Sequence, residues 1–466
     1  MEESKIKESF SWWRKYIFPI YNNEIPRFLL FTIIYCGLTF NYMFCVVLKD
    51  RIIFTSLGVA ENPMYFLLGL KLPVVITGIF FSFVYSRMAR KYSPYKSFLF
   101  LFIPSIAFLI LSAIFVKYLH FLQISPNTLQ KFLKIPIGGY CMLIIGYWIY
   151  FLNNLCVELL GVLILNIFWQ LSHLNSSYDE KKRFYPLYFL LSYGVHISSG
   201  YIMGRLNIFS SIIVLFFMAG IIVTALSYLV KEVLKNSLYD EGMLNNKNQD
   251  RPRNTLIFIS LIPILYGICS TCVGVFWDSK VFKLLGNKGP IMVFMMTYKY
   301  RCTLITFLVA FLAGPLIGRF SWWAITITAP ILVLITSSCF FIISHPIVMG
   351  FLQNTCHLNS LWWVVMVGAI ALTIIQSLHS VLLLLPQIIF MGSQKKNNLI
   401  QGQSLSIFFY EIGKGVGTIM KLYIVKNATF NITPILWFIT TFVCLLWMYF
   451  LLKINEEMVL LEERNN

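Results

Sequence analysis

Cations within long apolar stretches are the residues of this sequence best suited to chemistry. An ionisable group at membrane depth costs a few kcal/mol, so it normally faces a partner or a water-filled path. The cations in such stretches outnumber the carboxylates: they are Lys49, Lys71, Lys299, Arg301, Lys414 and Lys421, against Glu158 and Glu411. Such a net cationic interior suits a polyanion, because lysine and arginine both bind phosphate oxygens.

Glu158 is the most isolated of these charges. It lies in the middle of an apolar stretch that is long enough to span a bilayer, and no basic residue lies within one or two helical turns of it. A purely structural pairing with another helix is the alternative. We favour a role in a solute path, where the carboxylate would repel substrate, couple transport to an ion, or take a proton.

Several of the cations also have structural alternatives. Lys49 and Lys421 lie near expected helix ends, from which a lysine can reach the interface. Glu411 and Lys414 are three residues apart and could neutralise each other on one helix face.

Positions along the expected helices rank the remaining cations. Lys71 precedes the expected kink at Pro73. Lys299 and Arg301 would point to different sides of one helix, so we expect at most one of them at the centre and favour Arg301.

Neutral polar residues in the apolar stretches have two interpretations. Asn41, Tyr42 and Gln376 could hydrogen-bond a base or a ribose, but polar residues in membrane helices more often bond across helices. His379 could titrate or bind a metal, but a lone histidine beside Ser377 and Ser380 more often bonds to another helix. The sequence contains no Walker loop, metal-ligand spacing or catalytic triad, and we expect neither an enzyme nor a bound cofactor or metal.

Composition places the chain among polytopic membrane proteins. Of 466 residues, 58% are hydrophobic and only 12% are charged, and the mean hydropathy is +0.75. The net charge of +18 is spread over loops and helix ends, so we expect no nucleic acid as partner. Most of the ten cysteines lie in apolar segments, which predicts no disulfide framework, and the Cys269–Cys272 pair is best explained by packing.

Hydropathy predicts an all-α fold of about twelve transmembrane helices. The expected spans are 28–48, 64–86, 97–117, 147–172, 184–204, 209–230, 255–277, 290–317, 322–344, 361–385, 403–424 and 433–453. Met1–Arg27 is interpreted as a cytosolic, interfacial lead. An even number of spans puts both termini on one side, and the alternate loops rich in lysine and arginine predict that this side is the cytosol.

A long polar stretch after the sixth span divides the chain. We expect an N-terminal six-helix half in 1–230, a cytosolic linker in 231–254, and a C-terminal six-helix half with a short tail in 255–466. This is the layout of major-facilitator-type transporters, and repeat-built folds of this kind place the solute near the midplane between the halves.

Two sequence blocks resemble a known family. The first is WWRKYIFPIYNNEIPRFLLF with FNYMFCVVLKD; the second is VELLGVLILNIFWQLSHLNSSYDEKKRFYPLY; and EIGKGVGT around Lys414 is a looser third match. They resemble the nucleotide transporter family, the ATP/ADP translocases of plastids, intracellular bacteria and microsporidian parasites. The chain looks like a divergent member most similar to the microsporidian ones.

The resemblance implies functional charges at Lys49, Glu158 and Lys414. Three departures affect substrate choice and ion coupling: Val46 and Val47 stand where the family has an arginine and an aspartate, and Gly274 stands where it has a glutamate.

We therefore expect a membrane carrier that exchanges ATP for ADP or imports purine nucleotides by alternating access. Lys49, Arg301 and Lys414 would receive phosphates. Lys299, Lys71 and Asn41 are further substrate-binding candidates, listed with Glu158. GTP or NAD are other possible nucleotides, and the expected carrier is a monomer in the plasma membrane of an intracellular parasite, with a mitosome membrane as the alternative.

Two other functions remain open. The same fold could carry another organic anion, such as a dinucleotide or a sugar phosphate. A membrane-embedded transferase is disfavoured, because no acid/base pair or metal site lies at an expected membrane face.

Overall fold

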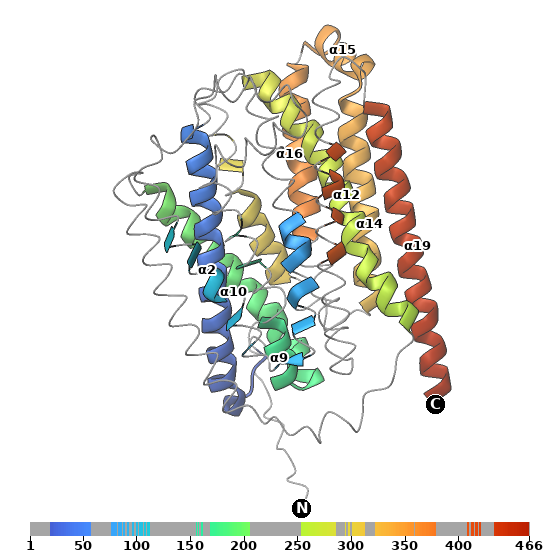
Figure 1. The fold of residues 1–466 in the computed structure, drawn as a ribbon. Coiled ribbons are helices and arrows are strands. Elements are labelled where there is room, and N and C mark those ends of the chain that lie inside the picture. Colours follow the sequence, from blue (N-terminus) through green and yellow to red (C-terminus); the bar gives the residue numbers. More distant parts are fainter. Residues whose placement is uncertain are drawn as a thin grey trace, which may run out of the picture.

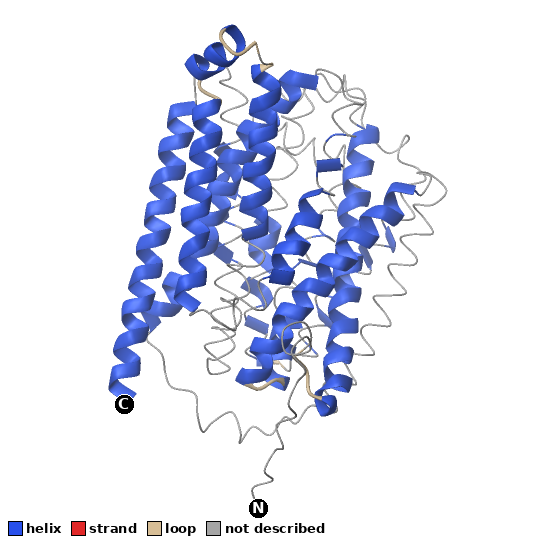
Figure 2. Ribbon diagram, turned by 180° about the vertical axis from the view of Figure 1, so that it is seen from behind, coloured by secondary structure: helices blue, strands red, loops and turns tan. Residues whose placement is uncertain are grey.

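The computed structural model describes residues 19–56, 168–205, 253–285, 301–312, 322–357, 359–378 and 433–465, with scattered positions in 76–111, 155–161, 294–298 and 408–420. Nearly all of these residues lie in helices (Figures 1 and 2). The elements discussed below are η1 (Asn22–Glu24), α2 (Ile25–Ser56), α9 (Trp169–Asn175), α10 (Tyr178–Arg205), α12 (Arg253–Leu285), α14 (Trp322–Ile343), α15 (Pro346–Asn354), α16 (Ser360–Leu378) and α19 (Thr433–Asn465).

The helices form because their sequences are apolar on all sides, as expected of helices whose outer faces meet lipid. Within the described residues, five helices are long and apolar enough to cross a membrane, in α2, α12, α14, α16 and α19. Hydroxyl side chains stay inside them by donating to a carbonyl one turn back, as Thr271 Oγ1 does to Gly267 O at 2.7 Å. Pro263 and Pro330 lie inside α12 and α14, as membrane helices tolerate.

Two groups of helices make up the described bundle. In the N-terminal part, α2 and α10 lie side by side. In the C-terminal part, α12 and α14 both pack against α16 and α19. The start of α2 and the end of α19 lie at the same end of the bundle, while α15 projects from the opposite end (Figures 1 and 2).

The C-terminal group packs through aliphatic and aromatic side chains and through close helix approach. Its buried residues include Ile259, Val333, Val364 and Leu451. Gly368 of α16 lies against the rings of Trp277 and Phe340, where an added Cβ would come within 2.4 Å and 2.5 Å of ring atoms. Small residues of this kind permit close packing where the lipid provides no hydrophobic driving force.

The expected cysteine chemistry agrees with this packing. Cys269 and Cys272 are buried free thiols in this core, and Cys269 Sγ lies 3.7 Å from Cys444 Sγ. Within the described residues, no group of histidine, cysteine, aspartate or glutamate could hold a metal ion.

Only the end of the expected N-terminal lead is described. Met1–Arg27 was predicted to be a cytosolic, interfacial lead; residues 1–18 lie outside the described residues, and the end from Pro19 onward contacts α10. Ile20 and Glu24 are both buried, and helix α2 already begins at Ile25. The physical reason for this contact is that Glu24 finds a cationic partner on α10.

Candidate functional site

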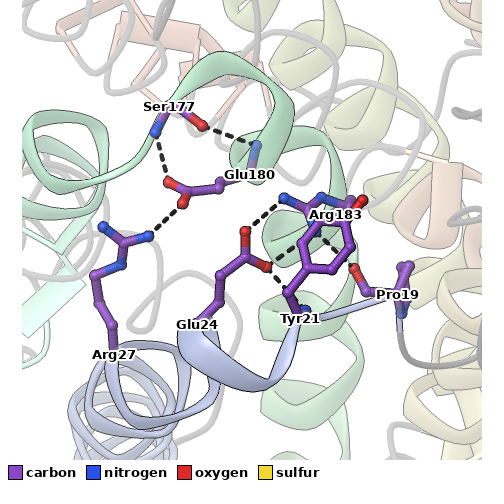
Figure 3. A network of polar contacts seen from close by, with 7 residues as sticks. All are labelled: Pro19, Tyr21, Glu24, Arg27, Ser177, Glu180 and Arg183. Atoms are coloured by element: carbon purple, nitrogen blue, oxygen red, sulfur yellow. Dashed lines mark hydrogen bonds and ion pairs between the residues drawn. The ribbon is translucent and has the colours of Figure 1, made fainter. Parts of the chain in front are cut away.

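The most elaborate polar network in the described chain joins the start of α2 to the start of α10 (Figure 3). Glu24 ends the short helix η1, and its Oε2 accepts a bond from the Tyr21 backbone N–H at 3.0 Å. This local hydrogen bond orients the carboxylate independently of any residue distant in the sequence. The carboxylate then points toward α10 (Figure 3).

Arg183 of α10 binds this carboxylate with both arms of its guanidinium. Nη1 donates to Glu24 Oε2 at 2.9 Å and Nη2 donates to Glu24 Oε1 at 2.7 Å. Nη1 also donates to the Pro19 carbonyl at 3.2 Å, and the guanidinium lies 4.5 Å from the centre of the Tyr21 ring. Two-pronged arginine–carboxylate pairs are among the strongest and most directional polar contacts.

A second ion pair lies beside the first. Arg27 of α2 contacts Glu180 of α10. Glu180 also accepts from the Ser177 N–H at 2.7 Å, while Ser177 Oγ accepts from the Glu180 N–H at 3.3 Å. This reciprocal arrangement is a capping box, which starts α10 and holds the Glu180 carboxylate toward Arg27. We call Glu24, Arg183, Arg27 and Glu180 the charge clamp.

Aromatic rings continue the contact between the helices beyond the clamp. Phe28 stacks on Tyr188 with ring centres 5.2 Å apart, and Tyr35 stacks on Phe168 at 4.3 Å. Trp169 of α9 stacks on Phe189 at 5.3 Å. Such ring pairs add about 1 kcal/mol each beyond the area they bury, so this part of α2 and α10 forms a stiff unit.

A buried polar group lies on the α9 side of the clamp. The Tyr185 hydroxyl and His173 Nδ1 share a hydrogen bond of 2.5 Å. Lys181, which precedes the expected span 184–204, is only 6% exposed. Burial lowers the pKa of its ammonium to about 8, while the neighbouring Glu180 carboxylate acts in the opposite direction.

The clamp and its rings were not predicted from the sequence, although their residues carry the family resemblance. Glu24 and Phe28 belong to the first block, whereas Arg183 and Phe184 belong to the second. Glu24 and Arg183 are 159 positions apart, so nothing local pairs them. The presence of complementary charges in both blocks is the signal that could have suggested the contact.

The structure describes three of the seven predicted substrate residues. Lys49 lies on α2, although only its backbone is described. Asn41 of α2 is fully buried, and Arg301 is exposed at the start of helix 301–312. The remaining four, Glu158, Lys71, Lys299 and Lys414, lie outside the described residues, as do Glu411, Lys421 and His379.

The helix that carries Arg301 touches the N-terminal group. Ala310 packs against Leu190 and Tyr193 of α10, and Phe307 lies 4.0 Å from the position of an added Cβ at Gly194. Helix 301–312 therefore lies where residues of the two expected halves meet. Arg301 lies on the opposite face of this helix from Ala310, and it shares that exposed face with Leu304 and Leu308.

Polar residues of the expected eighth and tenth spans bond across the helices. Gln376 Oε1 accepts from Cys302 Sγ at 2.9 Å, and the hydroxyls of Thr306 and Ser377 are 2.8 Å apart. For Gln376, the cross-helix alternative is therefore the one observed. Asn41 differs, because neither atom of its amide has a hydrogen-bond partner within the described part of the chain.

Glycines around Lys414 allow close contact with α12. An added Cβ on Gly413 would lie 3.2 Å from the Ile264 backbone, and one on Gly417 would lie 2.3 Å from Thr271 Oγ1. Close approach at these glycines is thus confirmed for the neighbours of Lys414. An added Cβ on Gly274, by contrast, would lie 3.7 Å from the Leu372 side chain of α16, an apolar neighbour at the position where the resemblance leads one to expect a glutamate.

Comparison with known proteins gives relatives along nearly the whole chain. The ADP,ATP carrier protein 5 of Rickettsia bellii is 22% identical, and the alignment covers 95% of this chain and 96% of the relative. The ADP,ATP carrier protein 1 of Chlamydia muridarum is 23% identical over 70% of this chain and 68% of the relative.

Solved structures show the same fold. The proton:xylose symporter XylE, of the major facilitator superfamily, superposes with a TM-score of 0.57 at 12% identity, covering 93% of this chain and 96% of the symporter. A bacterial homologue of the iron transporter ferroportin gives a TM-score of 0.60 at 9% identity, covering 92% and 99%. The fold is thus that of a polytopic, major-facilitator-like membrane protein.

The family comparison covers the chain from end to end. The TLC ATP/ADP transporter family matches residues 3–458, a range that includes the clamp and every predicted substrate residue. The chain belongs to the TLC ATP/ADP transporter family.

Proposed function

We propose that this protein carries purine nucleotides across a membrane by alternating access, exchanging ATP for ADP or importing nucleotide. The observation that carries the proposal is the family match over residues 3–458, together with relatives named ADP,ATP carrier proteins. It has no enzymatic step. Its six-helix halves are 1–230 and 255–466, joined by a cytosolic linker in 231–254.

The proposed site places cations against the phosphates. Arg301 is exposed at the start of helix 301–312, and its guanidinium is proposed to receive phosphate oxygens. Lys49 on α2 and Lys414 supply further positive charge, and Lys299 and Lys71 are secondary candidates. A nucleotide triphosphate carries several negative charges and requires such partners at low dielectric.

Glu158 is proposed as the group that makes the site reversible. In the empty carrier its carboxylate would neutralise nearby lysines, and incoming phosphates would compete for them. Occupancy would thereby bias the equilibrium between inward-open and outward-open forms. Glu158→Gln is expected to slow exchange more than it weakens binding.

The location and assembly of the carrier are also proposals. The termini are expected in the cytosol, the carrier is expected to act as a monomer, and its closest kinship is expected with microsporidian carriers. An intracellular parasite's plasma membrane is the favoured membrane and a mitosome membrane the alternative. A carrier of another organic anion is the second candidate function, favoured by Gly274 lying where the resemblance leads one to expect a glutamate.

The test is uptake of labelled ATP, GTP and NAD into liposomes that contain the purified protein, with and without internal ADP. Saturable ATP uptake that internal ADP stimulates supports exchange. Saturable uptake without that stimulation supports net import. Lys414→Ala should abolish uptake while membrane insertion persists, and absence of any nucleotide uptake by the wild type would exclude the proposed function.

A further inference from the structure

Asn41 is an exception among the polar side chains of the described helices. It lies on α2, within the expected span 28–48, and its side chain has no exposed surface. Neither Nδ2 nor Oδ1 has a hydrogen-bond partner in the part of the chain that the structure describes. The residue therefore buries one strong donor group and one strong acceptor without using either.

Other polar groups on these helices find partners where Asn41 does not. Asn175 Nδ2 donates to the Leu171 carbonyl one turn back, at 2.9 Å. Gln376 bonds across helices to Cys302. Several described side chains bury a single unpaired atom, as Trp447 does with Nε1 and Thr32 with its hydroxyl, but among described residues Asn41 alone leaves two side-chain polar atoms unpaired.

Such an amide is costly unless a partner arrives in another state. Leaving a buried polar group without its bond forfeits its hydration, and an isosteric leucine would avoid that loss. The amide presents a donor beside an acceptor in one plane. The ligand group that complements it offers an acceptor beside a donor, as the adenine edge does with a ring nitrogen next to the N6 amino group.

The next residue of α2 lies close to the expected fourth span. Tyr42, the next residue of α2, has its ring 3.6 Å from the position of an added Cβ at Gly161, three residues after Glu158. The turn of α2 that carries Asn41 therefore adjoins the expected fourth span.

We propose that Asn41 recognises the adenine base of the transported nucleotide through two hydrogen bonds, one to the N6 amino group and one to an adjacent ring nitrogen. This inference rests on the proposed function. Because the side chain has no exposed surface here, the contact forms in a conformation in which the helices beside α2 have separated. Asn41 then sets base preference, while the cations hold the phosphates.

The test compares ATP with analogues that lack one ring nitrogen, 7-deaza-ATP and 1-deaza-ATP, as competitors of labelled ATP on the full-length carrier in liposomes. We expect one analogue to compete about tenfold more weakly than ATP on the wild type. In Asn41→Leu this difference should disappear. Thr39→Ala, which alters a buried residue of the same helix, should retain it.

Stability gives a second, independent measurement. Asn41→Leu removes an unpaired buried amide, so the empty carrier should melt at the same or a higher temperature. A clear fall in melting temperature would show that the amide has a structural partner and would overturn the inference. If the analogue competes equally weakly on wild type and Asn41→Leu, or as well as ATP on both, the role of Asn41 in base recognition is overturned while the proposed function stands. If the wild type binds no ATP, the proposed function is overturned as well.

Discussion

The two described helix groups are held together by different chemistry. At their starts, α2 and α10 are joined by the charge clamp and by stacked rings. The C-terminal group packs through aliphatic and aromatic side chains and through close approach at glycine. An ion pair described in that group, Lys453–Glu456, joins two exposed side chains of α19.

This difference follows from where water is available. Ion pairs hold best where the charges are partly shielded yet do not bear the full desolvation cost, as at the end of a helix pair. Deeper in the bundle, lipid is as apolar as leucine, so fit between surfaces must provide the attraction. The N-terminal pair therefore depends on a few specific residues, and the C-terminal group depends on shape.

The largest expected effect breaks the shape-dependent group. Gly368→Ala places a Cβ 2.4 Å from the Trp277 ring and 2.5 Å from the Phe340 ring, and neither rigid ring can yield cheaply. We expect a loss of about 3 kcal/mol, from overpacking. Gly350→Ala in α15 is the control, because no atom lies within 4 Å of its added Cβ. Thermal melting of the purified carrier measures the stability of both variants. Equal melting temperatures for Gly368→Ala and Gly350→Ala would show that the helices can move apart at Gly368.

The next effect breaks the specific contact of the other group. Arg183→Gln leaves the Glu24 carboxylate, which is 7% exposed, without its cation. We expect a loss of about 2 kcal/mol. Lys453→Gln removes one partner of the exposed pair on α19 and should leave the melting temperature unchanged.

A charge exchange sharpens this result. The double variant Glu24→Arg with Arg183→Glu should recover part of the stability lost in either single variant. If the double variant loses as much free energy of unfolding as the two single variants lose together, the contact between these charges contributes nothing to α2–α10 packing.

A third prediction uses pH. The pKa of Lys181 is lowered by burial from 10.5 to about 8, so the folded state disfavours its charged form. Below pH 8 the lysine is protonated in both states and the penalty is complete. Between pH 8 and pH 10.5 the unfolded state binds more protons, so stability rises with pH. Lys181→Met should therefore stabilise the protein at pH 7 by about 1 kcal/mol, with a gain that shrinks toward pH 10. A gain that is constant across this range would contradict the lowered pKa.

The smallest effect distinguishes the two ion pairs of the clamp. Arg27 has a more exposed side chain than Arg183 and makes one ion-pair contact instead of a two-pronged one. Arg27→Gln should cost about 0.5 kcal/mol, as partly exposed pairs do. It should cost less than Arg183→Gln when both are melted in parallel, and a reversed order would make Glu180 the more important carboxylate.

Hydropathy predicted the helices well and their ends less well. The expected span 322–344 coincides with α14, Trp322–Ile343. The expected span 433–453 starts with α19 but stops early, because the helix continues through polar residues to Asn465. Hydropathy detects the part of a helix in contact with lipid and cannot detect a continuation into water.

Contacts between distant segments could not be predicted in the same way. The pairing of Glu24 with Arg183 depends on the tertiary packing of α2 on α10, so the contact between the end of the lead and α10 was not predicted. For the substrate residues, Arg301 is exposed on its helix, but its role in binding phosphate stays a prediction. Asn41 shows the opposite limit, because only coordinates reveal that an amide has no partner.

The length of α19 has a practical consequence. Its 33 residues correspond to about 50 Å of helix, whereas the hydrocarbon core is about 30 Å thick. Leu451 and Ile454 are buried, so α19 packs against the bundle at least as far as Ile454. A fluorophore attached to α19 beyond Ile454 would move rigidly with the C-terminal half. Its orientation would report in real time how that half tilts during each transport cycle.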